Sequence, residues 1–121
     1  MPKHIVLLED EPLLLELLQQ VLLLEGHQAT CLSDPQTLIE VLRAEKPDAL
    51  LLDVNLQDGN GLDLLGKIRA DHNLKNLFVI LSSGMDYRQN AHQAGANAFL
   101  MKPYSPGALL DLLESQGVQG G

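Results

Sequence analysis

Four short apolar runs along the chain each lead directly into polar side chains that can take part in chemistry. The runs and the residues that follow them are 5–8 before Glu9 and Asp10, 49–52 before Asp53, 78–81 before Ser82, and 98–101 before Lys102. Continuous apolar runs of this length are typical of strands covered on both faces, as in a parallel sheet. Because the carboxyl ends of parallel strands lie along one edge of the sheet, we expect these acids, this hydroxyl and this amine to converge there.

The segments between the runs carry helix signals, so that strand and helix alternate along the chain. Prolines stand where helices are expected to begin, and Gly26 and Gly95 stand where two of them are expected to end. We expect strands at 5–8, 28–31, 49–53, 78–81 and 98–101, and helices at 12–25, 35–45, 62–70, 87–94 and 106–116. Short connections with right-handed crossovers then predict one α/β domain over 1–121, a doubly wound five-stranded parallel sheet with helices on both faces.

Three smaller expectations follow from the same pattern. The segment 28–31 alternates polar and apolar residues, which places it at the sheet edge. The segment 57–61 is rich in turn formers and reads as a loop. The last residues, 117–121, are expected to form a frayed tail.

Length, charge and cysteine content limit the classes of function. The chain has 121 residues and a formal net charge of −8. Direct binding to nucleic acid or to an anionic membrane needs a basic face, so we expect neither. Cys31 is the only cysteine, which excludes an internal disulfide and favours a cytoplasmic location. No targeting segment is evident, and the apolar stretch 13–24 is too short to span a bilayer.

The residue types at the expected sheet edge suit phosphoryl chemistry. Glu9, Asp10 and Asp53 would repel one another, and a divalent cation relieves such repulsion. Oxygen ligands favour Mg²⁺, which bridges carboxylates to phosphate oxygens. The Asp53 carboxylate can attack phosphorus to form an acyl phosphate, and Lys102 would neutralise charge on the transferred group.

Two adjacent serines compete for a third role at this edge. The hydroxyl of Ser82 can donate a hydrogen bond to a phosphoryl oxygen. Ser83 competes with it, but the sequence alone favours a turn-forming role for Ser83.

The ordered set at these strand ends resembles the receiver domain of response regulators in two-component signalling. The resemblance is carried by Glu9-Asp10, Asp53, Ser82 and Lys102-Pro103, and it covers nearly the whole chain. It implies a flavodoxin-like sheet with strand order 2-1-3-4-5. In the family the Lys-Pro peptide bond is usually cis. The stretch from Ser82 to Gly95 is about two residues shorter than the usual receiver pattern, which predicts a shortened fourth helix.

The resemblance also implies an activity and a metal. Asp53 would accept a phosphoryl group from a phosphohistidine on a sensor histidine kinase or a histidine phosphotransfer protein. Asp10 and Asp53 would bind Mg²⁺ directly, Glu9 through water, and Asn55 through its backbone carbonyl. The chain would then act only on itself, by phosphotransfer to and dephosphorylation of Asp53, and would not be an enzyme with external substrates.

The resemblance further implies a switch. Ser82 would be the switch hydroxyl, Lys102 the lysine of the site, and Phe99 the switch aromatic. Movement of Ser82 toward the phosphoryl group would leave space into which Phe99 rotates, which changes the face made by the fourth helix, fifth strand and fifth helix. That face would then serve a phosphorylation-dependent dimer or a downstream effector.

The first helix contains more leucines than one sheet-facing stripe can bury. Helical spacing assigns to the sheet Leu14, Leu17, Leu18, Val21 and Leu22. The residues left outside the core are Leu13, Leu15, Leu23 and Leu24. An exposed leucine cluster commonly marks a partner surface, and receivers dock kinase or phosphotransfer helices on this helix. We hypothesise a docking face that includes Leu13 and Leu15; leucines that are merely exposed singly are the alternative.

Three other functions fit parts of the pattern. One is a receiver-like interaction module that is not phosphorylated. Another is a Mg²⁺-dependent phosphohydrolase with an aspartate nucleophile, although that class places the nucleophile on its first strand. A flavin-binding electron carrier would need a glycine- and hydroxyl-rich phosphate loop where this chain has Glu9-Asp10-Glu11-Pro12.

Overall fold

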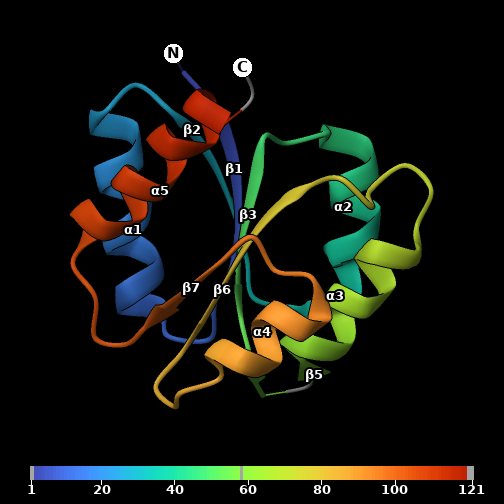
Figure 1. Cartoon of the computed structure of the whole chain (residues 1–121). Coiled ribbons are helices and arrows are strands. Elements are labelled where there is room, and N and C mark those ends of the chain that lie inside the picture. Colours follow the sequence, from blue (N-terminus) through green and yellow to red (C-terminus); the bar gives the residue numbers. More distant parts are fainter. Residues whose placement is uncertain (1, 58, 120–121) are drawn as a thin grey trace.

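A five-stranded parallel sheet with helices on both faces forms the centre of the protein (Figure 1). The computed structural model describes residues 2–57 and 59–119. In chain order the sheet contains β1 (His4–Leu8), β2 (Gln28–Leu32), β3 (Ala49–Asp53), β6 (Phe78–Ser83) and β7 (Ala98–Met101). Their spatial order is β2-β1-β3-β6-β7, and each pairing in this sheet is parallel. The predicted order 2-1-3-4-5 is therefore confirmed, with the second strand at an edge.

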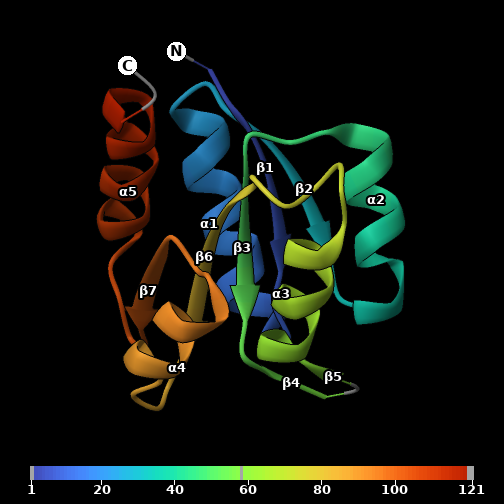
Figure 2. The same ribbon diagram turned by 45° about the vertical axis from the view of Figure 1, so that its right-hand side comes forward.

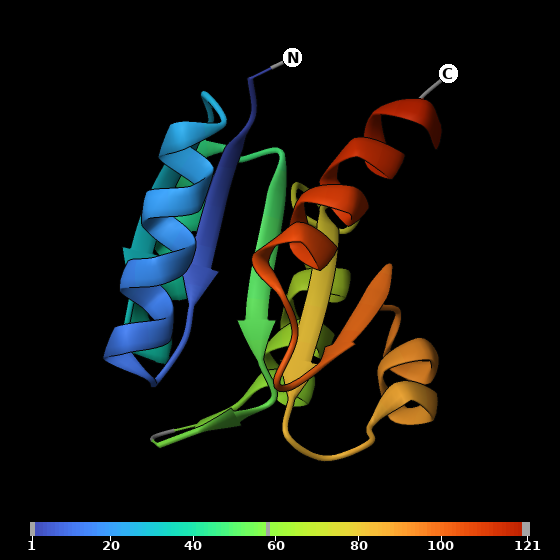
Figure 3. The ribbon, with the colours of Figure 1, turned by 90° about the vertical axis from the view of Figure 1, so that its left-hand side faces the viewer.

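Two layers of helices cover the sheet. The helices are α1 (Pro12–Leu24), α2 (Leu38–Glu45), α3 (Gly61–Ala70), α4 (Arg88–Ala94) and α5 (Pro106–Gln119). Side chains of α1 and α5 pack on one face of the sheet, and those of α2, α3 and α4 pack on the other. Figure 1 shows α1 and α5 on one side of the sheet and α2 and α3 on the other, and Figure 3 looks onto the sheet from the side of α1 and α5. Ile5 and Leu7 face the first layer and Val6 and Leu8 the second, which is why the run is apolar at every position.

The carboxyl ends of the strands lie at the edge of the sheet opposite the start of β1. Figure 2 shows the arrowhead of β3 pointing to the end of the molecule where α4, β4 and β5 lie. In this register Asp53 is level with Ser82, and Ser83 with Met101, the residue before Lys102. Beyond β3 the chain forms a small antiparallel pair, β4 (Asn55–Leu56) with β5 (Gly59–Asn60). The chemistry-bearing ends of the strands are therefore brought to one edge, as the sequence predicts.

Several element bounds differ from the prediction. The second helix begins with a 3-10 turn at Pro35–Thr37, where Asp34 Oδ1 accepts from the Gln36 backbone N–H at 3.0 Å. The expected loop 57–61 contributes β5 to the small antiparallel pair, and Asp58 lies outside the described residues. Helix α5 continues through Gln119, beyond the expected end at Gln116, and residues 120–121 are not described. Helix α4, of seven residues, is short as expected.

The leucines of α1 are distributed differently from the prediction. Leu18 and Leu22 are fully buried, and Leu15 packs against the core instead of facing outward. Leu17, assigned to the sheet, is 48% exposed. The helix is rotated so that the stripe Leu15-Leu18-Leu22, with spacing of three and four, faces the sheet. The hypothesis of an exposed Leu15 is therefore wrong.

The rest of the prediction for α1 agrees with the structure. Leu13 is 82% exposed and Leu24 is 84% exposed, while Leu14 and Val21 are partly buried. Within the described residues, none of the helices has both the length and the apolar character needed to cross a membrane.

Candidate functional site

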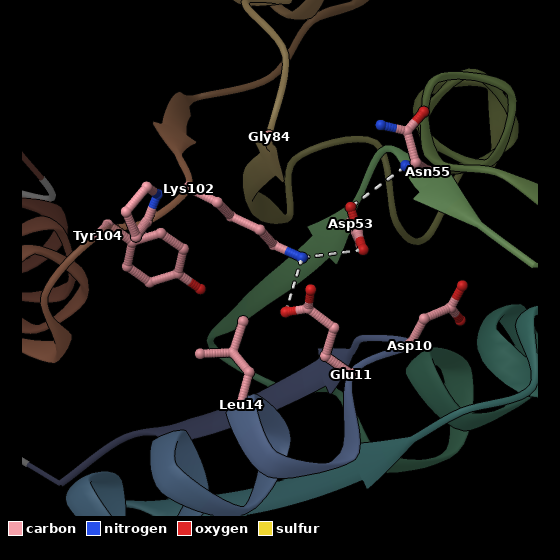
Figure 4. Close-up of a pocket in the computed structure, with 9 residues that line it drawn as sticks. Asp10, Glu11, Leu14, Asp53, Asn55, Gly84, Lys102 and Tyr104 are labelled. Atoms are coloured by element: carbon pink, nitrogen blue, oxygen red, sulfur yellow. Dashed lines mark hydrogen bonds and ion pairs between the residues drawn. The ribbon is translucent and has the colours of Figure 1, made fainter.

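A cavity of about 550 Å³ opens at the carboxyl edge of the sheet (Figure 4). Its lining consists of Asp10, Glu11, Leu14, Asp53, Asn55, Gly84, Lys102, Pro103 and Tyr104. These residues come from the β1–α1 connection, the start of α1, the end of β3, β4, and the segments after β6 and β7. The polar residues singled out at three of the four strand ends thus surround one cavity. Glu9, Ser82 and Ser83 are buried at this same edge of the sheet.

Lys102 is the electrostatic centre of the site. Its Nζ donates to Glu9 Oε1 at 2.9 Å and to Asp53 Oδ2 at 3.2 Å, and Glu11 Oε2 lies 3.6 Å away. The Glu9 side chain is 1% exposed, that of Asp53 5% and that of Lys102 16%. The peptide bond between Lys102 and Pro103 is cis, as the family pattern implies. One ammonium group therefore holds two nearly buried carboxyl groups together.

Burial and charge shift the pKa values in this cluster. Burial raises the pKa of Glu9, and the nearby Asp53 charge adds to the rise, while the hydrogen bond from Lys102 only partly opposes it. Burial lowers the pKa of Lys102, but its bonds to Glu9 and Asp53 outweigh that effect and the net pKa is raised. Lys102 therefore stays charged at neutral pH, and the ionised form of Glu9 is held at a cost in free energy.

Backbone contacts fix the loop that follows Asp53. Asp53 Oδ1 accepts from the Asn55 N–H at 3.2 Å, and the Gly61 N–H donates to the Val54 carbonyl at 2.8 Å. A Cβ at Gly61 would clash with the Asp53 carbonyl oxygen and lie 2.8 Å from Val54 Cα. Only glycine fits this close approach of α3 to β3. This role of Gly61 was not predicted from the sequence, although Asn60-Gly61 at a helix start was the available signal.

The acidic residues fit a hard divalent cation. Glu9 Oε2 is buried and has no hydrogen-bond partner among the described residues, while Asp10 and Asp53 line the cavity. All of the candidate ligands are oxygens, which Mg²⁺ prefers. In the described ranges no three His, Cys, Asp or Glu side chains stand in ligand geometry; Asp10 Oδ2 accepts from the Gln57 N–H, and Glu9 Oε1 accepts from Lys102 Nζ. Asn55 lines the same cavity.

The two serines at the end of β6 face opposite sides of the sheet. Strand alternation puts Ser82 on the side of Ile80, under α1 and α5, and Ser83 on the side of Leu81 and Phe99. The Ser82 Oγ is buried beside Asp53 and has no hydrogen-bond partner in the part of the chain that the structure describes. The Ser83 Oγ accepts from Asn55 Nδ2 at 2.9 Å and from the Met85 N–H at 3.1 Å.

This alternation corrects one part of the predicted switch. The sheet separates Ser82 from Phe99, so movement of Ser82 cannot open space for that ring. Phe99 is partly buried against the core on the α4 side and borders a hollow with Ala91 and His92. Ser83 lies on the same side of the sheet as Phe99. Ser82 was preferred to Ser83 as the switch residue because both serines were expected in a loop, whereas β6 extends through Ser83.

Comparisons with known proteins agree with this geometry. The family model described as "Response regulator receiver domain" matches residues 5–114. Among curated proteins, the probable transcriptional regulatory protein TcrX of Mycobacterium tuberculosis is 32% identical over 105 residues, which is 86% of this chain and 45% of TcrX. The chain spans about half or less of the curated relatives it matches.

Solved structures show the same architecture. A putative response regulator from Chloroflexus aurantiacus superposes with a TM-score of 0.89 at 24% identity, covering 96% of this chain and 98% of that one, which shows the fold. The receiver domain of the sensor histidine kinase PA1611 from Pseudomonas aeruginosa superposes with a TM-score of 0.80 at 27% identity, covering 96% and 98%. That structure has a magnesium ion coordinated in its active site cleft.

Proposed function

The chain belongs to the response regulator receiver family, and on this basis we propose that Asp53 is a phosphoacceptor, with a phosphohistidine on a sensor histidine kinase or a histidine phosphotransfer protein as its donor. The observation that carries the proposal is the Asp53 carboxylate in an open cavity, 3.2 Å from the Lys102 ammonium and close to two further acids. A nucleophile, a counter-charge and a potential metal site are the parts that phosphoryl transfer needs.

The proposed transfer exchanges one bond to phosphorus for another. An Asp53 oxygen attacks phosphorus, the bond from phosphorus to the histidine nitrogen breaks, and that nitrogen keeps the electron pair. Lys102 then shifts from a bond with the Asp53 carboxylate to the new phosphoryl oxygens, while Glu9 holds the ammonium in place. The Asn55 N–H, which donates to Asp53 Oδ1, keeps the attacking carboxylate oriented.

Magnesium belongs to the same proposal. Glu9, Asp10 and Asp53, with the backbone carbonyl of Asn55, are the proposed ligand set. When bound, the ion would supply charge neutralisation for the incoming phosphoryl oxygens. The unpartnered Glu9 Oε2 and the all-oxygen donor set support it.

Phosphorylation is proposed to be read on the α4–β7–α5 face. The hydroxyl of Ser83, now bonded to Asn55 and the Met85 N–H, would turn toward the phosphoryl group. Phe99 lies on the same side of the sheet and would move into the space that opens. Ser82, with its unpartnered hydroxyl beside Asp53, stays a predicted donor to the phosphoryl group but not a partner of Phe99. The downstream effector or dimer that reads this face is part of the proposal.

The donor protein is proposed to dock on the exposed side of α1. Leu13 and Leu17 follow one another by one helical turn, both are exposed, and Leu14 between them lines the cavity. The proposed docking residues are therefore Leu13 and Leu17, whereas the sequence suggested Leu13 and Leu15. The cytoplasmic location, where such donors phosphorylate their partners, remains an expectation that the lone Cys31 supports.

The test is chemical. Incubation with a small phosphodonor should label the protein only when Mg²⁺ is present, and hydroxylamine should remove the label, because an acyl phosphate is the only expected product. Labelling that resists hydroxylamine, or that forms equally well in a chelator, contradicts the proposal. Steady turnover of an external phosphoester would favour the phosphohydrolase, and the absence of any label would favour the non-phosphorylated interaction module.

A further inference from the structure

Tyr104 carries a polar group at the cavity that the proposed function leaves unused. The residue lies two positions after Lys102 and lines the cavity together with Asp53. Its ring packs against the core under α1 and α5. Figure 4 shows its hydroxyl directed toward the side of the cavity where Lys102 and Leu14 lie. The ring is therefore held by packing, and the polar end faces the other groups of the site.

The hydroxyl of Tyr104 has no hydrogen-bond partner among the described residues. Four buried side-chain atoms in the described ranges lack one, and three of them belong to this edge of the sheet: Glu9 Oε2, Ser82 Oγ and the Tyr104 hydroxyl. A buried donor without an acceptor costs free energy comparable to a lost hydrogen bond. Such a group is expected to gain its acceptor in another state of the site.

The surroundings of Tyr104 favour an anionic acceptor. Burial, followed by the charge of Glu9, raises the pKa of Tyr104 to about 12. The phenol therefore remains protonated at neutral pH and can donate. Lys102 is already shared between Glu9 and Asp53, so it cannot by itself satisfy the several acceptor oxygens of a phosphoryl group. A neutral donor beside an ammonium group complements such an anion.

We propose that the Tyr104 hydroxyl donates a hydrogen bond to an oxygen of the phosphoryl group on Asp53, as a further phosphoryl-binding residue. The inference rests on the proposed phosphoacceptor function. In Figure 4 Tyr104 and Lys102 lie on one side of the Asp53 carboxylate, and Asn55 lies on the other. The two residues would thus contact the phosphoryl group from opposite directions.

Beryllofluoride with Mg²⁺ is a suitable probe, because it mimics a phosphoryl group on a carboxylate. We would measure its affinity for the full chain by calorimetry in wild type, Tyr104→Phe and Tyr87→Phe. Tyr87 is the matched control, since its hydroxyl donates to Met85 Sδ, at 3.9 Å, and the residue is not part of the cavity lining. Tyr104→Phe should bind about tenfold more weakly, the loss expected for one hydrogen bond to a charged group. Tyr87→Phe should bind like wild type, and Tyr104→Phe without ligand should unfold no earlier than wild type.

The absorbance of Tyr104 gives a second, direct measurement. The chain has two tyrosines and no tryptophan, so Tyr104 is the only such chromophore in Tyr87→Phe. Its ultraviolet spectrum should change when beryllofluoride binds. Equal affinity of wild type and Tyr104→Phe, or an unchanged spectrum in a protein that binds the probe, would overturn this inference alone. A wild type that neither binds the probe nor takes a phosphoryl group would overturn the proposed function and the inference together.

Discussion

Lys102 Nζ donates to Glu9 Oε1 across 2.9 Å, although 93 residues separate the two in the chain. The contact joins the end of β1 to the end of β7 across two other strands, because the sheet order places β1 beside β3 and β3 beside β6. Lys102 Nζ is also paired with the Asp53 carboxyl group, so one cation offsets the charges of two nearly buried acids. The stability and the chemistry of the site are therefore linked through the same ammonium group.

Removal of the ammonium group should destabilise the fold and strengthen the response to magnesium. Lys102→Met keeps most of the aliphatic stem but leaves Glu9 and Asp53 without their shared donor. We expect a loss of about 1–3 kcal/mol in the free energy of unfolding, measured with urea. Added Mg²⁺ should raise the melting temperature of this variant more than that of wild type. Lys67→Met, at an exposed position on α3, is the control and should show neither effect.

Glu9 should make stability fall as the pH rises. Its folded pKa lies above the ordinary value of 4.5, so between these two values the native state binds more protons than the unfolded state. The contribution is fully present below 4.5 and is lost as the pH rises through the folded pKa. The free energy of unfolding of Glu9→Gln, relative to wild type, should therefore increase as the pH rises above 4.5. If the difference in the free energy of unfolding between Glu9→Gln and wild type does not change with pH, the pKa of Glu9 is not raised in the folded state.

Gly61 and Gly66 on α3 should respond to alanine in opposite directions. Gly61→Ala places a methyl group against the Asp53 carbonyl, and we expect it to cost about 1–3 kcal/mol and to slow phosphorylation of Asp53. Among the described residues no atom lies within 4 Å of a Cβ added at Gly66, so Gly66→Ala should stabilise the helix by about 0.5–1 kcal/mol. Urea unfolding of both variants tests this pair. Equal destabilisation would mean that the close approach at Gly61 is not the cause.

Substitution of Ser83 and substitution of Ser82 by alanine should have different effects on the α4–β7–α5 face. Ser83→Ala removes the acceptor of Asn55 Nδ2 and should abolish the NMR shift changes around Phe99 when the site is phosphorylated. Ser82→Ala should leave those changes intact, and the loss of an unpartnered hydroxyl should not lower stability. If Ser82→Ala abolishes the NMR shift changes around Phe99 and Ser83→Ala does not, the proposal that Ser83 couples the site to Phe99 is wrong.

The docking proposal predicts a difference between the two ends of α1. Leu13→Lys should slow phosphotransfer from a phosphohistidine donor about tenfold, as for loss of an apolar anchor at an interface. The same variant should accept phosphoryl from a small phosphodonor at the wild-type rate. Leu24→Lys is the control, because Leu24 is equally exposed, at 84%, but lies at the far end of the helix. Equal slowing by both variants would exclude a docking site at the first turn.

The sequence predicted the sheet and most of the site because both depend on local patterns. The fully apolar runs define β1, β3, β6 and β7, and the residue after each run must lie at the carboxyl edge. The features that the sequence did not predict are the directions in which side chains face. The rotation of α1 could not be derived from consecutive leucines at 13–15, since either Leu14 or Leu15 continues a helical stripe through Leu18.

The other misses have the same kind of cause. The faces of Ser82 and Ser83 depend on how far β6 extends, and strand ends are poorly marked when turn-forming residues also end the strand. The hydroxyl of Tyr104 reaches the cavity only through the path of the chain after Pro103, which no pattern in the sequence describes. The need for glycine at position 61 becomes visible only when α3 is seen against the Asp53 carbonyl.

The most direct test of the account is the intact mass of the protein after incubation with a small phosphodonor and Mg²⁺. Wild type and Asp63→Asn, which alters an exposed acid in the first turn of α3, should each gain the mass of one phosphoryl group. Asp53→Asn should gain none. A wild type that stays at its original mass, or an Asp53→Asn variant that gains as much as wild type, would contradict the assignment of Asp53 as the phosphoacceptor.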